Sequence, residues 1–149
     1  MRLRNRDWRD VVLVTLLASW LPLGVWASAA PRSFYDSFPG FGRTWVSPDG
    51  PFNEHLLRDV GGLWLGLSAL LIYALLERSR PLVRSAGLVV VVFSVPHVGY
   101  HVTNTEVLAV SDAIANIAAL VFVLFLGLAL LASPQANEAT EHATRARTS

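Results

Sequence analysis

Long stretches without a charged residue constrain this chain more than any other feature. Four segments contain no Asp, Glu, Lys or Arg, namely residues 11–31, 60–76, 85–105 and 113–137. A helix that crosses the hydrocarbon core of a bilayer needs about 20 apolar residues, and three of the four segments reach that length unaided. The second reaches it when it is extended back to Asn53, which we predict as the N-cap of this helix. We therefore predict an all-α fold, an integral membrane four-helix bundle.

Composition agrees with this fold class and bounds the function. Hydrophobic residues make up 53% of the 149-residue chain and charged residues 15%, with a mean hydropathy of +0.46, as in membrane proteins. Cysteine is absent, which excludes disulfides and thiolate metal sites. A net charge of +1 without a basic patch argues against a nucleic-acid partner. We expect one transmembrane domain, residues 1–132, with helices at about 10–30, 53–77, 84–103 and 105–132, followed by a disordered cytoplasmic tail, residues 133–149.

The arginines predict the orientation. They concentrate before the first span, between the second and third spans, and in the tail: Arg2, Arg4, Arg6, Arg9, Arg78, Arg80, Arg84, Arg145 and Arg147. The positive-inside rule then places both termini in the cytoplasm, and we expect the protein in the cytoplasmic membrane of a bacterium. The first span also resembles a secretory signal, because Ala27, Ser28 and Ala29 follow its apolar run. Its length favours a retained span, and cleavage would leave the orientation unchanged.

One long aromatic loop is expected on the extracytoplasmic side, at residues 31–53. Its composition of six aromatic residues among glycines and prolines argues against disorder. A loop of this length in a compact protein is commonly functional. It is interpreted either as a lid over a polar site or as an aromatic belt at the headgroup level, with a short helix at residues 33–38.

Ionisable residues recur near the outer ends of three helices and suggest a site. Asp59, His97 and Asp112 lie about six residues inside their helices, or ~9 Å at 1.5 Å per residue. Charged groups at that depth are expensive in lipid, so we expect them to face one another. On the second helix, His55 and Asp59 share a face with a Gly-x-x-x-Gly pair, Gly62 and Gly66, which predicts that this face packs against a neighbouring helix.

His97 and His101 are one turn apart on the third helix, a common way to present two imidazoles to one metal ion. The predicted metal ligands are His55, Asp59, His97 and His101. This set of nitrogen and oxygen ligands suits Zn, Fe, Mn or Cu. Haem is the alternative cofactor and would need only two of the histidines as ligands. The residues predicted to support the ligands are Asp112, Asn116, Arg58 and Tyr100. The alternative is that these side chains only hydrogen-bond one another, with Asp112 pairing either a histidine or Arg58.

Other polar residues receive simpler interpretations. Pro96 is expected to kink the third helix, and Thr103 with Glu106 predicts a capping box at the start of the fourth. Glu54 and Glu106 lie near helix starts, where the helix dipole accounts for them. His142 belongs to the tail.

A family resemblance accompanies these patterns. The stretch 31–41, the run from Asn53 to Gly61 and the later Pro96, His97, Tyr100 and His101 resemble uncharacterised four-helix membrane proteins of the DoxX-like kind. The resemblance covers residues 10–132 and implies a four-helix bundle. It implies no common chemistry.

Three functions are therefore open. The first is a protein that binds a metal ion or haem, with or without metal-dependent catalysis. The second is an accessory subunit in which the polar cluster only locks the helices together. The third is a metal-free membrane enzyme acting on a lipid, quinone or isoprenoid by proton transfer from histidine. The expected partners are the lipid bilayer and either a small hydrophobic ligand or a membrane-protein partner.

Overall fold

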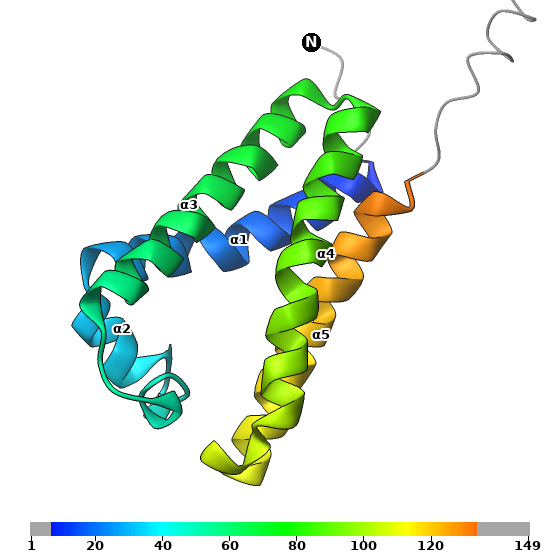
Figure 1. Cartoon of the computed structure of the whole chain (residues 1–149). Helices are drawn as coiled ribbons and strands as arrows, with labels where there is room; N and C mark the ends of the chain where they lie inside the picture. The colour runs from blue at the N-terminus through cyan, green and yellow to red at the C-terminus, as the bar shows by residue number, and fades with distance from the viewer. Residues whose placement is uncertain (1–6, 134–149) are drawn as a thin grey trace, which may run out of the picture.

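The computed structural model describes residues 7–133, which are mainly helical (Figure 1). Four long helices dominate it: α1 (Trp8–Ala29), α3 (Glu54–Glu77), α4 (Arg80–Thr103) and α5 (Val110–Leu131). Each is long and apolar enough to cross a membrane, which confirms the four predicted spans. The tail predicted at 133–149 lies, except for Ser133, outside the described residues.

The long helices associate as two pairs, α1 with α3 and α4 with α5, and contacts between the pairs are sparse. Figure 1 shows α3 and α4 diverging from the tight turn that joins them. We call this end, with residues 78–79 and the start of α1, the turn end. The opposite end, with residues 30–53 and 104–109, is the loop end.

Close backbone approach at glycine holds each pair together. In the α1–α3 pair, a Cβ built on Gly24 would lie 3.0 Å from the backbone nitrogen of Leu65, and one built on Gly61 would lie 2.6 Å from that of Ser28. In the α4–α5 pair, a Cβ on Gly87 would lie 2.5 Å from the Leu131 nitrogen. In lipid, where apolar attraction between helices is weak, such contacts let backbones approach and gain dispersion energy.

This arrangement corrects the predicted packing face of α3. Within residues 7–133, and apart from sequence neighbours and the backbone of α3 itself, no atom lies within 4 Å of a Cβ built on Gly62 or Gly66, so the Gly-x-x-x-Gly pair faces outward. Gly61 is the glycine that contacts α1. The buried row of α3 also includes Leu57, Trp64, Ser68 and Leu71.

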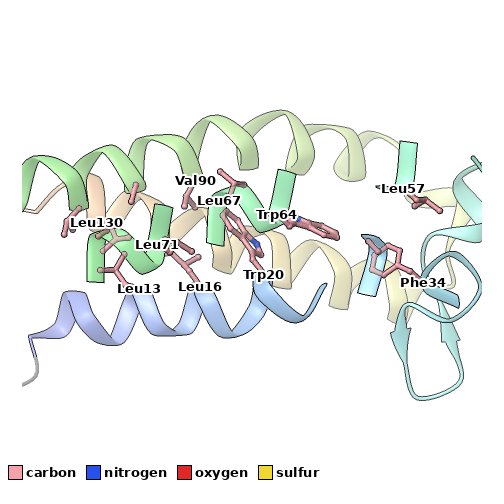
Figure 2. Packing of buried hydrophobic residues seen from close by; sticks show 14 residues of the cluster. Leu13, Leu16, Trp20, Phe34, Leu57, Trp64, Leu67, Leu71, Val90 and Leu130 are labelled. Carbon is pink, nitrogen blue, oxygen red and sulfur yellow. The ribbon is translucent and has the colours of Figure 1, made fainter. Parts of the chain in front are cut away.

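The apolar core follows these rows along the bundle, from Leu13 near the turn end to Leu57 and Phe34 near the loop end (Figure 2). Figure 2 shows it as a cluster in which Leu13 and Leu16 of α1 approach Leu71 of α3. Val90 of α4 and Leu130 of α5 complete it. An ion pair between Asp10 and Arg78, 2.8 Å between Oδ2 and Nη2, closes α1 onto α3 at the turn end.

Helix boundaries depend on local capping. The Asn53 side chain accepts a hydrogen bond from the Leu56 nitrogen at 3.0 Å, so the predicted N-cap of α3 is confirmed. α4 begins at Arg80 rather than at residue 84, because Pro81 occupies its first turn, where no donor is needed. The helix continues through Pro96.

The predicted capping box is wrong. Thr103 ends α4, and its hydroxyl donates to the Gly99 and Tyr100 carbonyls instead of capping the next helix. Glu106 lies in the 3₁₀ helix η2 (Thr105–Val107), and α5 begins only at Val110. Asp112 is therefore in the first turn of α5, less deep than predicted.

The connection between α1 and α3 is ordered. It contains α2 (Pro31–Ser37), close to the predicted short helix, a hairpin of β1 (Pro39–Gly40) and β2 (Arg43–Thr44), and the 3₁₀ helix η1 (Ser47–Asp49). The Tyr35 hydroxyl donates to the Gly50 carbonyl at 2.6 Å. Buried Phe34 contacts the ring of Trp64 edge-on at 5.8 Å, which fixes the loop to α3.

Candidate functional site

The predicted ligands on α3 pair with each other and not with α4. His55 Nδ1 lies 2.8 Å from Asp59 Oδ2, one turn along the helix. Their side chains are 85% and 64% exposed, on the outward face that also carries Gly62 and Gly66. This pair is therefore a surface feature of the described chain.

The predicted ligands on α4 form a second pair near the loop end. The rings of His97 and His101 are 5.1 Å apart and inclined by 34°. Both residues are half-buried. Exposed Tyr100 contacts the His101 ring edge-on at 5.3 Å, so its role is to flank that histidine.

Aromatic rings continue the His97–His101 pair toward the middle of the bundle. The Phe93 ring meets that of His97 edge-on at 5.4 Å. Trp20 of α1 meets Phe93 at 5.5 Å, so this column of rings joins the two helix pairs. His97 thus has Phe93 on one side and His101 on the other. A ligand at this position would meet both a polar imidazole nitrogen and an apolar aromatic surface.

Asp49 approaches the histidine pair from the loop, and no sequence pattern predicted this approach. Partial burial raises the pKa of the Asp49 carboxyl above its usual 3.8, while the nearby His101 acts in the opposite direction. Asp49, Gly50 and Pro51 form a turn pattern, which accounts for the residue types without any site. The approach of η1 to α4 depends on the folded loop.

The residues predicted to support the ligands are distributed differently. Asp112 forms an ion pair with Arg43 of β2, so it binds the loop and not a histidine. Arg58 binds Glu54 with 2.7 Å between Nη2 and Oε1 and donates to the Ser28 carbonyl. Glu54 thus has an ion-pair partner in addition to its place in the first turn of α3.

Asn116 remains near the pair. It is 6% exposed, and its Oδ1 has no hydrogen-bond partner within the described part of the chain. Because Gly87 contacts Leu131 and Val90 contacts Gly127, the antiparallel register places Asn116 at about the level of His101. Ligand support by Asn116 stays a prediction.

Several other buried polar atoms lack partners. Trp64 Nε1, Ser68 Oγ and Ser94 Oγ are all in residues less than a tenth exposed, and none has a hydrogen-bond partner among residues 7–133. The α1–α3 register places Ser68 opposite Trp20, which contacts Phe93 next to Ser94. An unpaired buried polar group costs about 1–3 kcal/mol, so these groups favour a bound ligand or water in this region.

The predicted four-residue metal centre is not assembled in this structure. Within residues 7–133, no group of three or more His, Cys, Asp or Glu side chains is arranged to hold a metal ion. His55 and Asp59 face outward from α3, whereas His97 and His101 face Phe93 and the loop. The physical reason is the choice of packing face on α3, which turns Gly61 and not Gly62 toward α1.

No family model, curated protein or solved structure matches the chain. The resemblance to DoxX-like proteins therefore stays a prediction.

Proposed function

We propose that this protein binds, within the membrane, a lipid-soluble molecule whose head carries a hydrogen-bonding oxygen, as quinones and phenols do. The observation that carries the proposal is the adjacent His97–His101 pair, whose His97 ring meets Phe93, which in turn meets Trp20. Imidazole donates to a carbonyl or accepts from a hydroxyl, and the aromatic column offers an apolar wall for the ring of the ligand.

The surrounding polar atoms support this class of ligand. Ser94 and Asn116 are buried on the two helices of the α4–α5 pair, and Ser94 Oγ and Asn116 Oδ1 have no hydrogen-bond partner among residues 7–133. A ligand oxygen is one way to satisfy such groups. His101 and Asp49 lie on the loop side of His97, so the same groups offer a path for a proton between the ligand head and the surface.

We further propose that the loop end faces outward and that both termini face the cytoplasm of a bacterium. Arg9 lies in the first turn of α1 at the turn end, and Arg78, Arg80 and Arg84 lie at or near the α3–α4 turn. Their concentration at one end supports this orientation under the positive-inside rule. The His97–His101 pair then lies near the extracytoplasmic end of α4.

The test uses the full chain in phospholipid nanodiscs and decyl-substituted 1,4-benzoquinone as the probe. Quinones quench tryptophan fluorescence on contact, and Trp20 belongs to the aromatic column. We expect saturable quenching by the wild type. His97→Ala should bind about tenfold more weakly, because about 1.4 kcal/mol is lost with one well-placed hydrogen bond.

The matched control is His55→Ala, which removes the exposed histidine of the His55–Asp59 pair on α3. It should bind like the wild type, and His97→Gln, which keeps a side-chain donor, should recover part of the affinity. Thermal unfolding of each variant checks that it is folded. Equal affinity for His97→Ala and His55→Ala, or quenching that never saturates, would refute the proposal.

A metal ion is the second candidate, because His97 and His101 present two nitrogen ligands one turn apart. Zinc binding would require both histidines and a further ligand, for which Asp49, the loop carboxylate that interacts with His101, is the candidate. Elemental analysis and zinc titration of the wild type and of His101→Ala separate the candidates. A Soret band in the purified protein would indicate haem.

If neither quinone nor metal binds, an accessory role becomes the better interpretation. The buried polar residues would then act only in helix packing. In that case His97→Ala and Asn116→Ala should lower the yield of folded protein and leave the activity of a partner complex unchanged.

A further inference from the structure

The tip of the β1–β2 hairpin presents a phenylalanine entirely to the surroundings. Phe41 is 100% exposed. Its φ is 58°, and the flanking Gly40 and Gly42 have φ values of 98° and 75°. Left-handed backbone is unfavourable for a bulky L-residue, and an exposed aromatic ring forgoes burial. The unfavourable backbone conformation and the unfavourable exposure of the ring coincide at Phe41, so we expect this ring to contact another surface.

The base of the hairpin is fixed to the rest of the loop. The Trp45 nitrogen donates to the Phe38 carbonyl at 2.8 Å, and the two rings pack edge-on at 5.8 Å. Pro39 pairs with Thr44, and Gly40 pairs with Arg43. The tip is therefore held out on an ordered base.

The ion pair between Arg43 and Asp112 sets the level of the hairpin. Asp112 is the third residue of α5, a helix long and apolar enough to span a membrane. Arg43 is two residues from Phe41, so the tip lies at the level at which α5 would enter the membrane. Figure 2 shows the two strands running across the direction of the long helices, so the hairpin points sideways and not along the membrane normal.

We propose that the Pro39–Thr44 hairpin is an interfacial anchor whose Phe41 ring inserts among the lipid headgroups of the adjacent leaflet. Segments that lie at a membrane surface bury Phe, Trp and Leu side chains at the boundary between the headgroups and the acyl chains. The charge of Arg43 remains at the same level, paired with Asp112. The anchor fixes the loop that carries Asp49, which interacts with His101, and its function does not depend on which ligand binds at the His97–His101 pair.

The natural absence of cysteine allows a direct test. Phe41→Cys carries one spin label in phosphatidylcholine vesicles, and its accessibility to oxygen, which concentrates in lipid, is compared with that to a water-soluble nickel chelate. Thr105→Cys, at an exposed residue in the α4–α5 turn, is the matched control. Because both side chains point away from the core, we expect both variants to fold, which circular dichroism checks.

We expect the ratio of oxygen to nickel accessibility to be severalfold higher at position 41 than at position 105. A label at 41 that is as accessible to nickel as the label at 105 would place the tip in water and overturn the proposal. Low accessibility to both reagents at 41 would also overturn it, because the tip would then be covered by protein, such as a second copy of the chain.

Discussion

Adding one methyl group to either of two adjacent glycines of α3 tests the packing of the bundle. In Gly61→Ala, the new Cβ would lie 2.6 Å from the Ser28 nitrogen and 3.0 Å from the Ala27 carbonyl carbon, both backbone atoms that cannot rotate away. In Gly62→Ala, no atom of the described chain lies within 4 Å of the new Cβ. The two changes are chemically identical and differ only in the face of α3 that they modify.

The expected magnitudes follow from two effects. Alanine is favoured over glycine in a helix by about 0.8–1 kcal/mol, and this gain applies to both variants. Overpacking costs about 1–3 kcal/mol and applies only to Gly61→Ala. Gly62→Ala should therefore be slightly more stable than the wild type, and the two variants should differ by about 1–3 kcal/mol.

The assay is unfolding in detergent micelles titrated with sodium dodecyl sulfate, followed by tryptophan fluorescence. Trp64 and Trp20 lie in the interface region and report its separation. Equal destabilisation by the two variants would refute the assigned packing face. Greater destabilisation by Gly62→Ala would restore the interface predicted from the Gly-x-x-x-Gly pattern.

Two further predictions concern charged groups at opposite ends of the bundle. Burial raises the pKa of Asp49 in the folded state, so the folded chain binds this proton more tightly and the stability of the protein falls as pH rises from 3.8 through the raised pKa. Thermal unfolding between about pH 3 and 6 should show this loss of stability in the wild type and not in Asp49→Asn. A wild type that instead gains stability relative to Asp49→Asn over this range would contradict the prediction. At the turn end, Arg78→Ala should lower the unfolding temperature more than the double variant Asp10→Asn with Arg78→Ala does. The reason is that the single change leaves the Asp10 carboxylate, which is 11% exposed, without its counter-ion. Equal decreases in unfolding temperature, measured by circular dichroism, would show that Asp10 tolerates burial without Arg78.

The existence and length of the spans were predictable because charge-free segments of this length have few other structures available. Asn53 was predictable as a cap because its side chain precedes the first turn of α3. The packing face of α3 was not. Gly61 and Gly62 are neighbours about 100° apart round the helix, and a bilayer is as apolar as a protein core, so hydrophobicity does not distinguish the face toward lipid from the face toward α1.

The polar partners were only partly predictable, because two of them, Arg43 and Asp49, come from the loop. His97 and His101 could be paired from their spacing on one helix. Arg43–Asp112 and the approach of Asp49 to His101 join residues far apart in sequence, and neither has a local pattern. The predicted convergence of His55 with His97 failed because it required α3 to turn its Gly62 face inward.

The pairing of α1 with α3 has a consequence for synthesis of the chain. α4 and α5 are joined by a short connection, so they can pack against each other as soon as both have emerged from the ribosome. α1 emerges first, and α2, the hairpin and η1 must follow before α3 is complete. During that interval the surface of α1 around Gly24 and Ser28 has no partner helix, so the N-terminal half of the protein acquires its final contacts well after its first span has been made.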